Sequence, residues 1–325
     1  KHLEFLQLSL VSCCELRREF YSAVDLLDNL CQLYEAGNRR ESTFNLQLWK
    51  GDLLLSAVYR NYPQLSPYSF ALAAVMEGSQ RRSLAAAKEA YARAHELCTQ
   101  HQLGTVERAL CHIALAKAEL LDVVPDVTVA QSRVDAALAL LDASPDISRE
   151  PHFGRGVRSY VDVVCRRDHG LLILWLMELQ CVISKLRGDL ANARRLLDKC
   201  LEYFGDTTSP FQKYHYANCL YLGSALYRVQ GENIYAEGIL RKSLGVCEDL
   251  IASSHTVRVD HPTLHAMRIL ILAQGFDLAR LLASQGRRTE GRQLWEEKRE
   301  QHLPSLTTVG TIYTNLFDGD PSPGF

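Results

Sequence analysis

Cys165 and His169 are the residues of this chain whose types best suit nucleophilic catalysis, because a histidine can activate a nearby cysteine thiolate. They are four residues apart, and on a helix that spacing makes two side chains surface neighbours. Cysteine proteases with such a pair bring the two residues together from the ends of β-strands, and this sequence has no strand pattern. We therefore predict that the pair is structural, that the chain has no catalytic residues and that it is not an enzyme.

His261 and His265 have the spacing of two metal ligands, since side chains at i and i+4 share one helix face. The glutamate of a zinc protease motif is missing between them, and Pro262 instead indicates the start of a helix. The cysteines contain no C-x-x-C pair. Gly-Arg-Gly at 154–156 begins like a phosphate-binding loop, but no apolar strand precedes it. The sequence therefore predicts neither a metal site nor a cofactor.

Two clusters of arginine are the remaining candidates for a binding site. Each cluster follows the turn of a helical pair, where a solvated helix face is one interpretation and a docking site for an acidic peptide is the other. We keep all six residues as candidate peptide- or partner-binding residues: Arg187, Arg194 and Arg195 in one cluster, and Arg287, Arg288 and Arg292 in the other.

The charge balance bears on the class of partner. The 325 residues include 36 Lys and Arg against 38 Asp and Glu, for a formal net charge of -2. A nearly neutral chain has no electrostatic reason to bind nucleic acid or an anionic membrane. We therefore expect the partners to be proteins.

The cysteines and the apolar runs bear on the compartment. Most of the ten cysteines fall among apolar helical positions, where a free cysteine behaves as a small hydrophobe, so we predict reduced thiols and a cytoplasmic or nuclear protein. The apolar run at 170–183 is interrupted by Glu178 and is too short for a membrane span. Because the chain begins at Lys1, we expect a fragment of a longer protein. The cysteines at apolar positions are Cys13, Cys14, Cys31, Cys98, Cys111, Cys181, Cys200 and Cys219.

The second half of the sequence repeats itself. The segments CVISKLRGDLANARRLLDKCL, SALYRVQGENIYAEGILRKSL and LARLLASQGRRTEGRQLWEEK each carry a glycine where two helices would meet, at positions 188, 231 and 286. Each then places a small residue on the inward face of the next helix, Ala193, Ala236 or Gly291. This pattern resembles the tetratricopeptide repeat (TPR), a pair of antiparallel helices with small residues at their crossing.

Earlier segments fit the same pattern less regularly. In residues 117–141, Pro125 takes the place of the turn glycine, with Ala118 before it and Ala130 after it. Ala23 and Ala87 mark the second helices of two further pairs, at intervals longer than the 34 residues of an ordinary TPR. The predicted fold is therefore all-α, an irregular TPR-like right-handed α-solenoid of antiparallel helical hairpins.

The helical pattern breaks at 60–69, 142–156 and 205–211, which are rich in Pro, Gly and Ser. We predict helical repeats over 1–144, an irregular insertion over 145–168, TPR-like repeats over 169–300 and an extended or disordered tail over 301–325. Core packing is expected of the three tryptophans, which fall on apolar stripes: Trp49, Trp175 and Trp295.

The segment LAKAELLDVVPDVTVAQSRVDAALALLDAS, at 115–144, resembles a helical hairpin in the N-terminal superhelical region of animal separases. The later segment at 168–201 is similar in layout to the helical pair that follows a long insertion in that region. The points of likeness in the first segment are Lys117, Glu119, Leu120, Asp126, Gln131, Ser132, Leu138, Leu140 and Leu141.

This resemblance implies a helical superhelix without the caspase-like protease domain of separase, so no catalytic residue is carried over. In insects the two parts of separase are separate polypeptides, and this chain resembles the protease-free subunit. The implied function is a non-catalytic scaffold that holds the protease and its inhibitor securin, and so controls cohesin cleavage and sister-chromatid separation.

A generic TPR adaptor is the alternative. The segments from 227 to 297 also resemble the repeats of kinesin light chains, in which a concave groove captures a cargo peptide. Such an adaptor would bind a short acidic or apolar peptide and would have no role in the cell cycle.

Overall fold

The computed structural model describes residues 2–16, 19–59, 78–122, 124–142, 169–204, 210–255 and 261–302. Over these ranges the secondary structure is entirely helical, which confirms the predicted all-α class. The α-helices are α1 (His2–Leu16), α2 (Phe20–Ala36), α3 (Arg40–Tyr59), α4 (Gly78–His101), α5 (Thr105–Leu120), α6 (Val127–Asp142), α8 (His169–Leu186), α9 (Leu190–Phe204), α10 (Pro210–Val229), α11 (Asn233–Ala252), α12 (His261–Ser284) and α13 (Arg288–His302), and a short 3₁₀ helix, η2 (Ser253–His255), follows α11.

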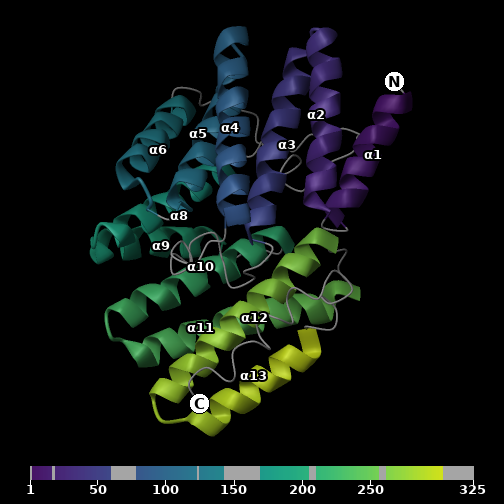
Figure 1. Ribbon diagram of the computed structural model, residues 1–325. Helices are drawn as coiled ribbons and strands as arrows, with labels where there is room; N and C mark the ends of the chain where they lie inside the picture. Colours follow the sequence, from purple (N-terminus) through teal and green to yellow (C-terminus); the bar gives the residue numbers. More distant parts are fainter. Residues whose placement is uncertain are drawn as a thin grey trace. The chain divides into compact units, whose positions relative to one another are not determined.

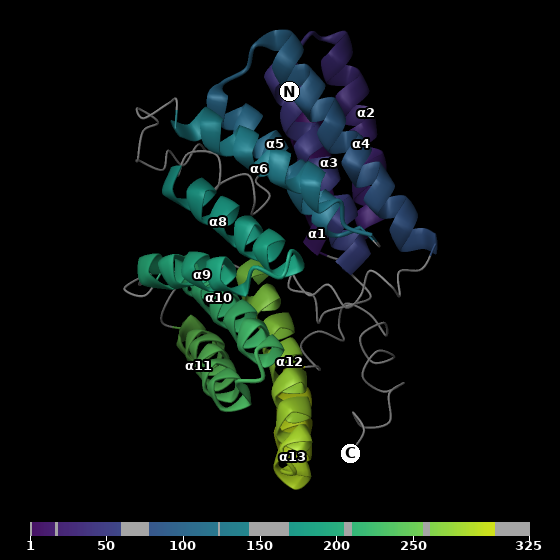
Figure 2. The ribbon, with the colours of Figure 1, turned by 90° about the vertical axis from the view of Figure 1, so that its left-hand side faces the viewer.

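The described helices fall into two compact units. The first contains α1 to α6 and α8 as far as Ile183, and the second contains the end of α8 from Ser184 together with α9 to α13. In the first unit each helix from α1 to α6 packs on the next in chain order (Figure 1). In the second unit α9 to α13 do the same (Figure 2). Successive packing of this kind is the arrangement of a helical solenoid.

The predicted turn glycines lie in the left-handed region of backbone space. The φ angles are +78° at Gly188, +79° at Gly231 and +86° at Gly286. A side chain with a Cβ is unfavourable there, so glycine lets the chain reverse between two helices within a few residues. The turn between α2 and α3 uses Asn38, with φ of +52°, because asparagine tolerates this conformation better than most residues.

Small residues line the crossings between helices, as the repeat pattern predicted. Ala23, Ala87, Ala130, Ala193 and Ala236 are all fully buried.

The backbones of α12 and α13 also approach closely at Gly291 of α13. A Cβ added to this residue would lie 2.7 Å from the carbonyl oxygen of Ala279 on α12. Ala279 precedes Gly291 by twelve positions, and Val11 with Ala23, Ala118 with Ala130 and Ser224 with Ala236 have the same spacing. The four pairs of helices therefore place small or buried residues at equivalent positions.

Pro125 lies in the turn between α5 and α6, so no helix crosses it. The next residue, Asp126, caps α6: its Oδ1 accepts hydrogen bonds from the backbone N–H of Thr128 at 3.1 Å and of Val129 at 2.9 Å. An aspartate at this position satisfies N–H groups that have no partner inside the helix. In this turn Pro125 therefore separates the two helices, and Asp126 stabilises the start of α6.

Most of the predictions that tryptophans and cysteines pack in the core are confirmed. Trp49 and Trp295 are buried and Trp175 is half-buried. The described cysteines are free thiols, and all of them except Cys13 are buried. The prediction of a packed position is wrong for Cys13, because this residue lies on the exposed side of α1 while the buried Cys14 next to it packs inward.

Several predicted breaks in the helical pattern fall outside the described residues. The stretches 60–69, 145–168 and 303–325 lie outside them. Of the predicted irregular stretch at 205–211, residues 205–209 lie outside the described set, and Pro210 already begins α10, a position where the missing N–H of proline costs nothing. Helix α13 continues to His302, two residues into the segment predicted as a tail.

No helix in the described ranges combines the length and the apolar character that crossing a membrane requires.

Candidate protein-binding site

An arginine and two tyrosines stack across the surface of the second unit. Nη2 of Arg194, on α9, donates a hydrogen bond to the Tyr227 hydroxyl at 2.6 Å, and the guanidinium carbon lies 4.6 Å from the centre of the Tyr227 ring. The Tyr235 ring, at the start of α11, stacks on Tyr227 with ring centres 5.9 Å apart and planes inclined by 23°. Three consecutive helices therefore contribute to one arginine–aromatic stack.

Large apolar side chains next to this stack are left in solvent. Ile234 is 83% exposed, Tyr235 66% and Val229 60%. Single exposed apolar residues are common on protein surfaces, but here three of them flank one turn, the one at Gly231. We name the set formed by Arg194, Tyr227, Val229, Ile234 and Tyr235 the aromatic patch.

The local fold explains why the patch faces outward. The backbone N–H of Glu232 donates to the carbonyl of Tyr227 at 2.9 Å, which closes the turn, and α11 begins at the next residue. Ala236 must point inward, since it is fully buried. Ile234 and Tyr235, the two residues before it, then occupy the outer side of the first turn of α11.

The first arginine cluster lies in the turn before α9 and in the first turns of that helix. Arg195 is exposed and donates from Nη2 to the side-chain oxygen of Asn192 at 2.9 Å, and Arg187 is exposed in the turn before α9. Arg194 belongs to the patch itself. The structure therefore brings one predicted arginine into an aromatic stack and leaves the other two at the surface beside the same pair of hairpins.

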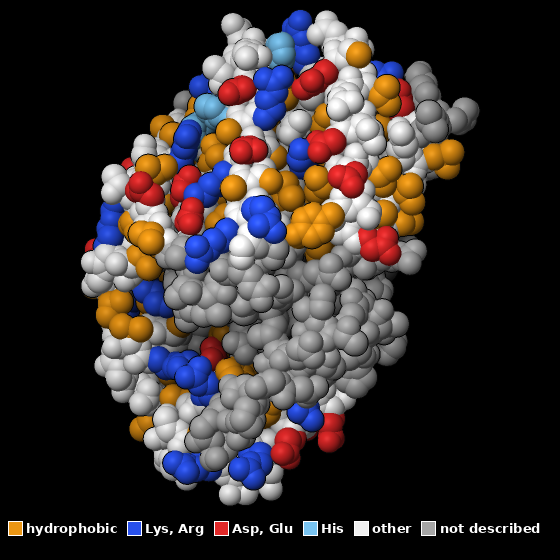
Figure 3. All heavy atoms as spheres, in the orientation of Figure 1, with side chains coloured by type: hydrophobic (Ala, Val, Ile, Leu, Met, Phe, Trp, Pro, Cys, Tyr) orange, Lys and Arg blue, Asp and Glu red, His pale blue; other side chains and the backbone are white. Residues whose placement is uncertain are grey.

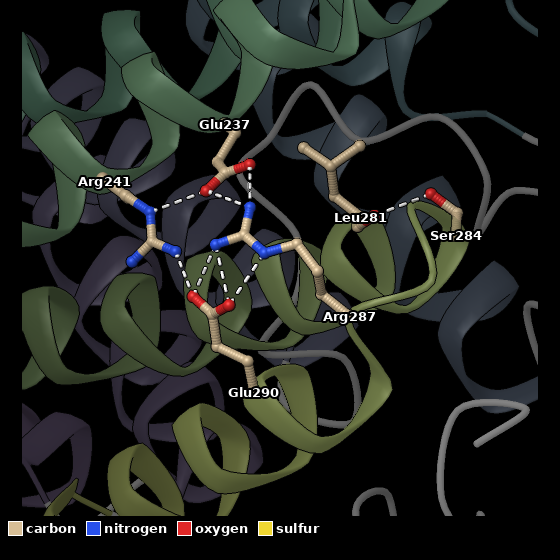
Figure 4. Close-up of polar contacts among 6 residues, drawn as sticks. All are labelled: Glu237, Arg241, Leu281, Ser284, Arg287 and Glu290. Atoms are coloured by element: carbon tan, nitrogen blue, oxygen red, sulfur yellow. Dashed lines mark hydrogen bonds and ion pairs between the residues drawn. The ribbon is translucent and has the colours of Figure 1, made fainter.

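The second cluster has a different role at Arg287, which lies in the turn before α13. It donates from Nη1 to Glu237 of α11 at 2.8 Å and from Nε and Nη2 to Glu290 of α13 at 2.8 and 2.7 Å (Figure 4). Arg241 of α11 closes the ring, with hydrogen bonds of 2.9 Å to Glu237 and 2.7 Å to Glu290. These hydrogen bonds from Arg287 and Arg241 lower the pKa of Glu290. The network links the α10–α11 hairpin to the α12–α13 hairpin, and the charge of Arg287 is already balanced.

Arg288 and Arg292 are exposed on α13. The outer side of this helix carries mostly charged and polar residues, while Gly291 and Trp295 face the core. A polar outer face of this kind is typical of a helix at the end of a repeat array. On the face of the molecule drawn in Figure 3, acidic, basic and apolar side chains are interspersed among the described residues.

Lys298 of α13 is buried, which the sequence analysis missed. Its Nζ lies 2.6 Å from a carboxylate oxygen of Glu248 and 2.7 Å from one of Glu297. Burial alone would lower the pKa of Lys298, but the two carboxylates raise it above its ordinary value. A signal was present in the sequence, because Lys298 follows Gly291 by seven residues and Trp295 by three, which places all three on one helix face.

The structure also bears on the residues that were considered as catalytic, metal-binding or phosphate-binding candidates. Helix α12 begins at His261, as Pro262 predicted. The side chains of His261, His265 and His169 are outside the described set, and so are Cys165 and residues 154–156. Among the residues that the structure does describe, no three His, Cys, Asp or Glu side chains gather as a metal site.

No protein-family model matches this sequence, and no curated protein matches it.

Proposed function

We propose that this chain is a non-catalytic helical scaffold that binds a protein partner through the aromatic patch. The observation that carries the proposal is the exposure of Ile234 and Tyr235 beside the stacked Arg194. Tyrosine and arginine are enriched among the residues that contribute most of the binding free energy in protein interfaces. Tyrosine buries a large area at a small cost in side-chain entropy, and arginine donates several hydrogen bonds from one planar group. The partner surface that fits is an apolar segment with acidic residues, because Arg194 supplies a positive charge within the patch.

The resemblance to separase suggests the identity of the partners. In that function the scaffold holds a caspase-like protease and securin in the cytoplasm or the nucleus, and thereby controls cohesin cleavage and sister-chromatid separation. A disordered inhibitor suits a surface built from successive hairpins, because it can fold along the surface as it binds.

A TPR adaptor for a cargo peptide is the second candidate. The observation that favours it is the regular geometry of the last two hairpins, with turn glycines at 231 and 286 and the close approach of Gly291 to Ala279. This geometry is typical of repeat arrays that bind peptides. The adaptor function requires no partner from the cell cycle.

The test is affinity purification of the chain from dividing cells, followed by mass spectrometry of the proteins that co-purify. The double variant Ile234→Ala/Tyr235→Ala removes the exposed part of the patch. The matched control is Tyr203→Ala, since Tyr203 is 51% exposed at the opposite end of α9. Thermal unfolding of all three proteins establishes that the substitutions leave the fold intact.

We expect the wild-type chain and the Tyr203 variant to recover a caspase-like protease and a securin, and the double variant to recover at least tenfold less of both. Recovery of motor or transport proteins in their place, with the same dependence on the patch, would favour the adaptor. Equal recovery of all partners by the double variant would contradict a role for the patch.

A further inference from the structure

Arg194 carries a positive charge that no acidic side chain balances. In the part of the chain that the structure describes, it forms no ion pair, and its hydrogen bond goes to the hydroxyl of Tyr227. Arg287 of the same unit differs, because it donates hydrogen bonds to both Glu237 and Glu290 (Figure 4). The charge of Arg194 is therefore available to a partner, and that of Arg287 is not.

Tyr227 holds this guanidinium in place. Its hydroxyl accepts the hydrogen bond from Nη2 of Arg194 at 2.6 Å, and its ring centre lies 4.6 Å from the guanidinium carbon. A free arginine side chain loses rotamer entropy when a partner immobilises it, and two contacts within the unit already restrict this one. Arginine has five N–H donors, so donors remain for a partner after the bond to Tyr227.

A carboxylate is the anion that fits this guanidinium. Two parallel N–H donors of an arginine match the two oxygens of a carboxylate. The stack of Arg194, Tyr227 and Tyr235 contains one cation, which balances one carboxylate. A phosphate monoester carries a charge of about −1.5 to −2 at pH 7, so part of its charge would stay unbalanced in the stack.

The apolar side chains of the aromatic patch lie close to Arg194. The Tyr227 ring contacts both Arg194 and Tyr235, at centre distances of 4.6 and 5.9 Å. The guanidinium carbon and the Tyr235 ring centre are therefore no more than about 11 Å apart, a span that about three residues of an extended chain cover. Ile234, next to Tyr235, is 83% exposed. One short segment can thus contact the charge and the apolar surface together.

We propose that the aromatic patch recognises a partner segment in which a glutamate or aspartate lies about three residues from an apolar side chain. The carboxylate accepts paired hydrogen bonds from Arg194, and the apolar side chain covers Ile234 and Tyr235. Tyr227 is a positioning residue, since it acts through Arg194. This inference rests on the proposed function, because it names the chemistry of the partner that binds the same patch.

The test is a titration of the full chain with three capped peptides, followed by NMR of ¹³C-labelled isoleucine methyl groups. The first peptide is Ac-Gly-Leu-Gly-Gly-Glu-Gly-NH2, the second has glutamine in place of the glutamate, and the third has phosphoserine there. We expect saturable shifts of the Ile234 methyl resonance. The glutamate peptide should bind at least threefold more tightly than the glutamine peptide, and the phosphoserine peptide should bind no more tightly than the glutamate peptide.

A double-mutant cycle assigns the selectivity to Arg194. In Arg194→Gln the ratio of the glutamate to the glutamine affinity should fall to about one. In Tyr227→Phe the ratio should fall in part, because the ring stays and the hydroxyl that orients Arg194 is lost. Arg280→Gln is the matched control, since Arg280 is an exposed arginine beside the Phe276 ring of α12, outside the patch. This variant should keep the wild-type ratio.

An unchanged ratio in a folded Arg194→Gln protein would overturn the proposal, as would tighter binding of the phosphoserine peptide or an Ile234 methyl that no peptide shifts. If Arg194→Gln unfolds, the comparison of the three peptides on the wild-type chain still decides.

Failure of this inference can be told apart from failure of the proposed function. Partners that are recovered through Ile234 and Tyr235 without selectivity for glutamate would support the scaffold and reject the carboxylate. Selectivity for glutamate without any recovered partner would support the carboxylate site and reject the scaffold.

Discussion

The close approach of α12 and α13 at Gly291 gives a prediction whose sign can be derived from the structure. In Gly291→Ala the new Cβ would lie 2.7 Å from the carbonyl oxygen of Ala279 and 3.4 Å from its carbonyl carbon and Cα. These are backbone atoms, so one helix must shift, and overpacking of this kind costs about 1–3 kcal/mol. The higher helix propensity of alanine returns about 1 kcal/mol. We therefore expect a net loss of stability of about 1 kcal/mol.

Gly238→Ala is the matched control. Gly238 lies within α11, and a Cβ added there would meet nothing within 4 Å. The same gain in helix propensity then acts alone, so this variant should be about 1 kcal/mol more stable than the wild type. The difference between the two variants isolates the packing cost, because the propensity gain is common to both.

The assay is equilibrium unfolding in urea, monitored by far-UV circular dichroism on the full chain. Hydrogen–deuterium exchange of peptides from α12 and α13 locates the effect, and exchange should accelerate there in Gly291→Ala. If Gly291→Ala proved as stable as Gly238→Ala, the close approach of α12 and α13 would be refuted.

Three further predictions concern the same fold. Ala193 is fully buried, so Ala193→Phe should lower the melting temperature and broaden the transition, and unchanged calorimetric melting would count against its packing role. Gly188 has φ of +78° with nothing near a new Cβ, so Gly188→Ala should destabilise by about 1–2 kcal/mol through backbone conformation alone, which urea unfolding measures. Burial, Arg268 and Lys298 lower the pKa of His302 to about 4, so the unfolded state binds more protons between pH 6.5 and 4 and stability should fall as the pH drops through that range. His302→Gln should flatten this pH dependence, and an unaltered slope would show that another group is responsible.

The features predicted well from the sequence are those set by local chemistry. Gly188, Gly231 and Gly286 were identified as turns, and all three adopt the left-handed conformation that favours glycine. Ala193 and Ala236 were assigned to the inward face, and both are buried, because helical periodicity alone fixes which side of a helix packs.

The features that were missed depend on residues far apart in the chain. Glu237 lies fifty positions before Arg287, and Tyr227 lies thirty-three after Arg194. In a regular repeat such pairs could be found from the repeat length, but the irregular spacing here gives no such guide. The exposure of Ile234 and Tyr235 could have been inferred, since both precede the inward-facing Ala236 at the start of α11.

The central claim, that the chain is a protein-binding scaffold acting through the aromatic patch, is tested most directly by the amounts of partner that co-purify with the wild type and with Ile234→Ala/Tyr235→Ala. The scaffold function predicts that a caspase-like protease and a securin are recovered with the wild type and reduced at least tenfold with the double variant. Equal recovery by a double variant that melts like the wild type would contradict it.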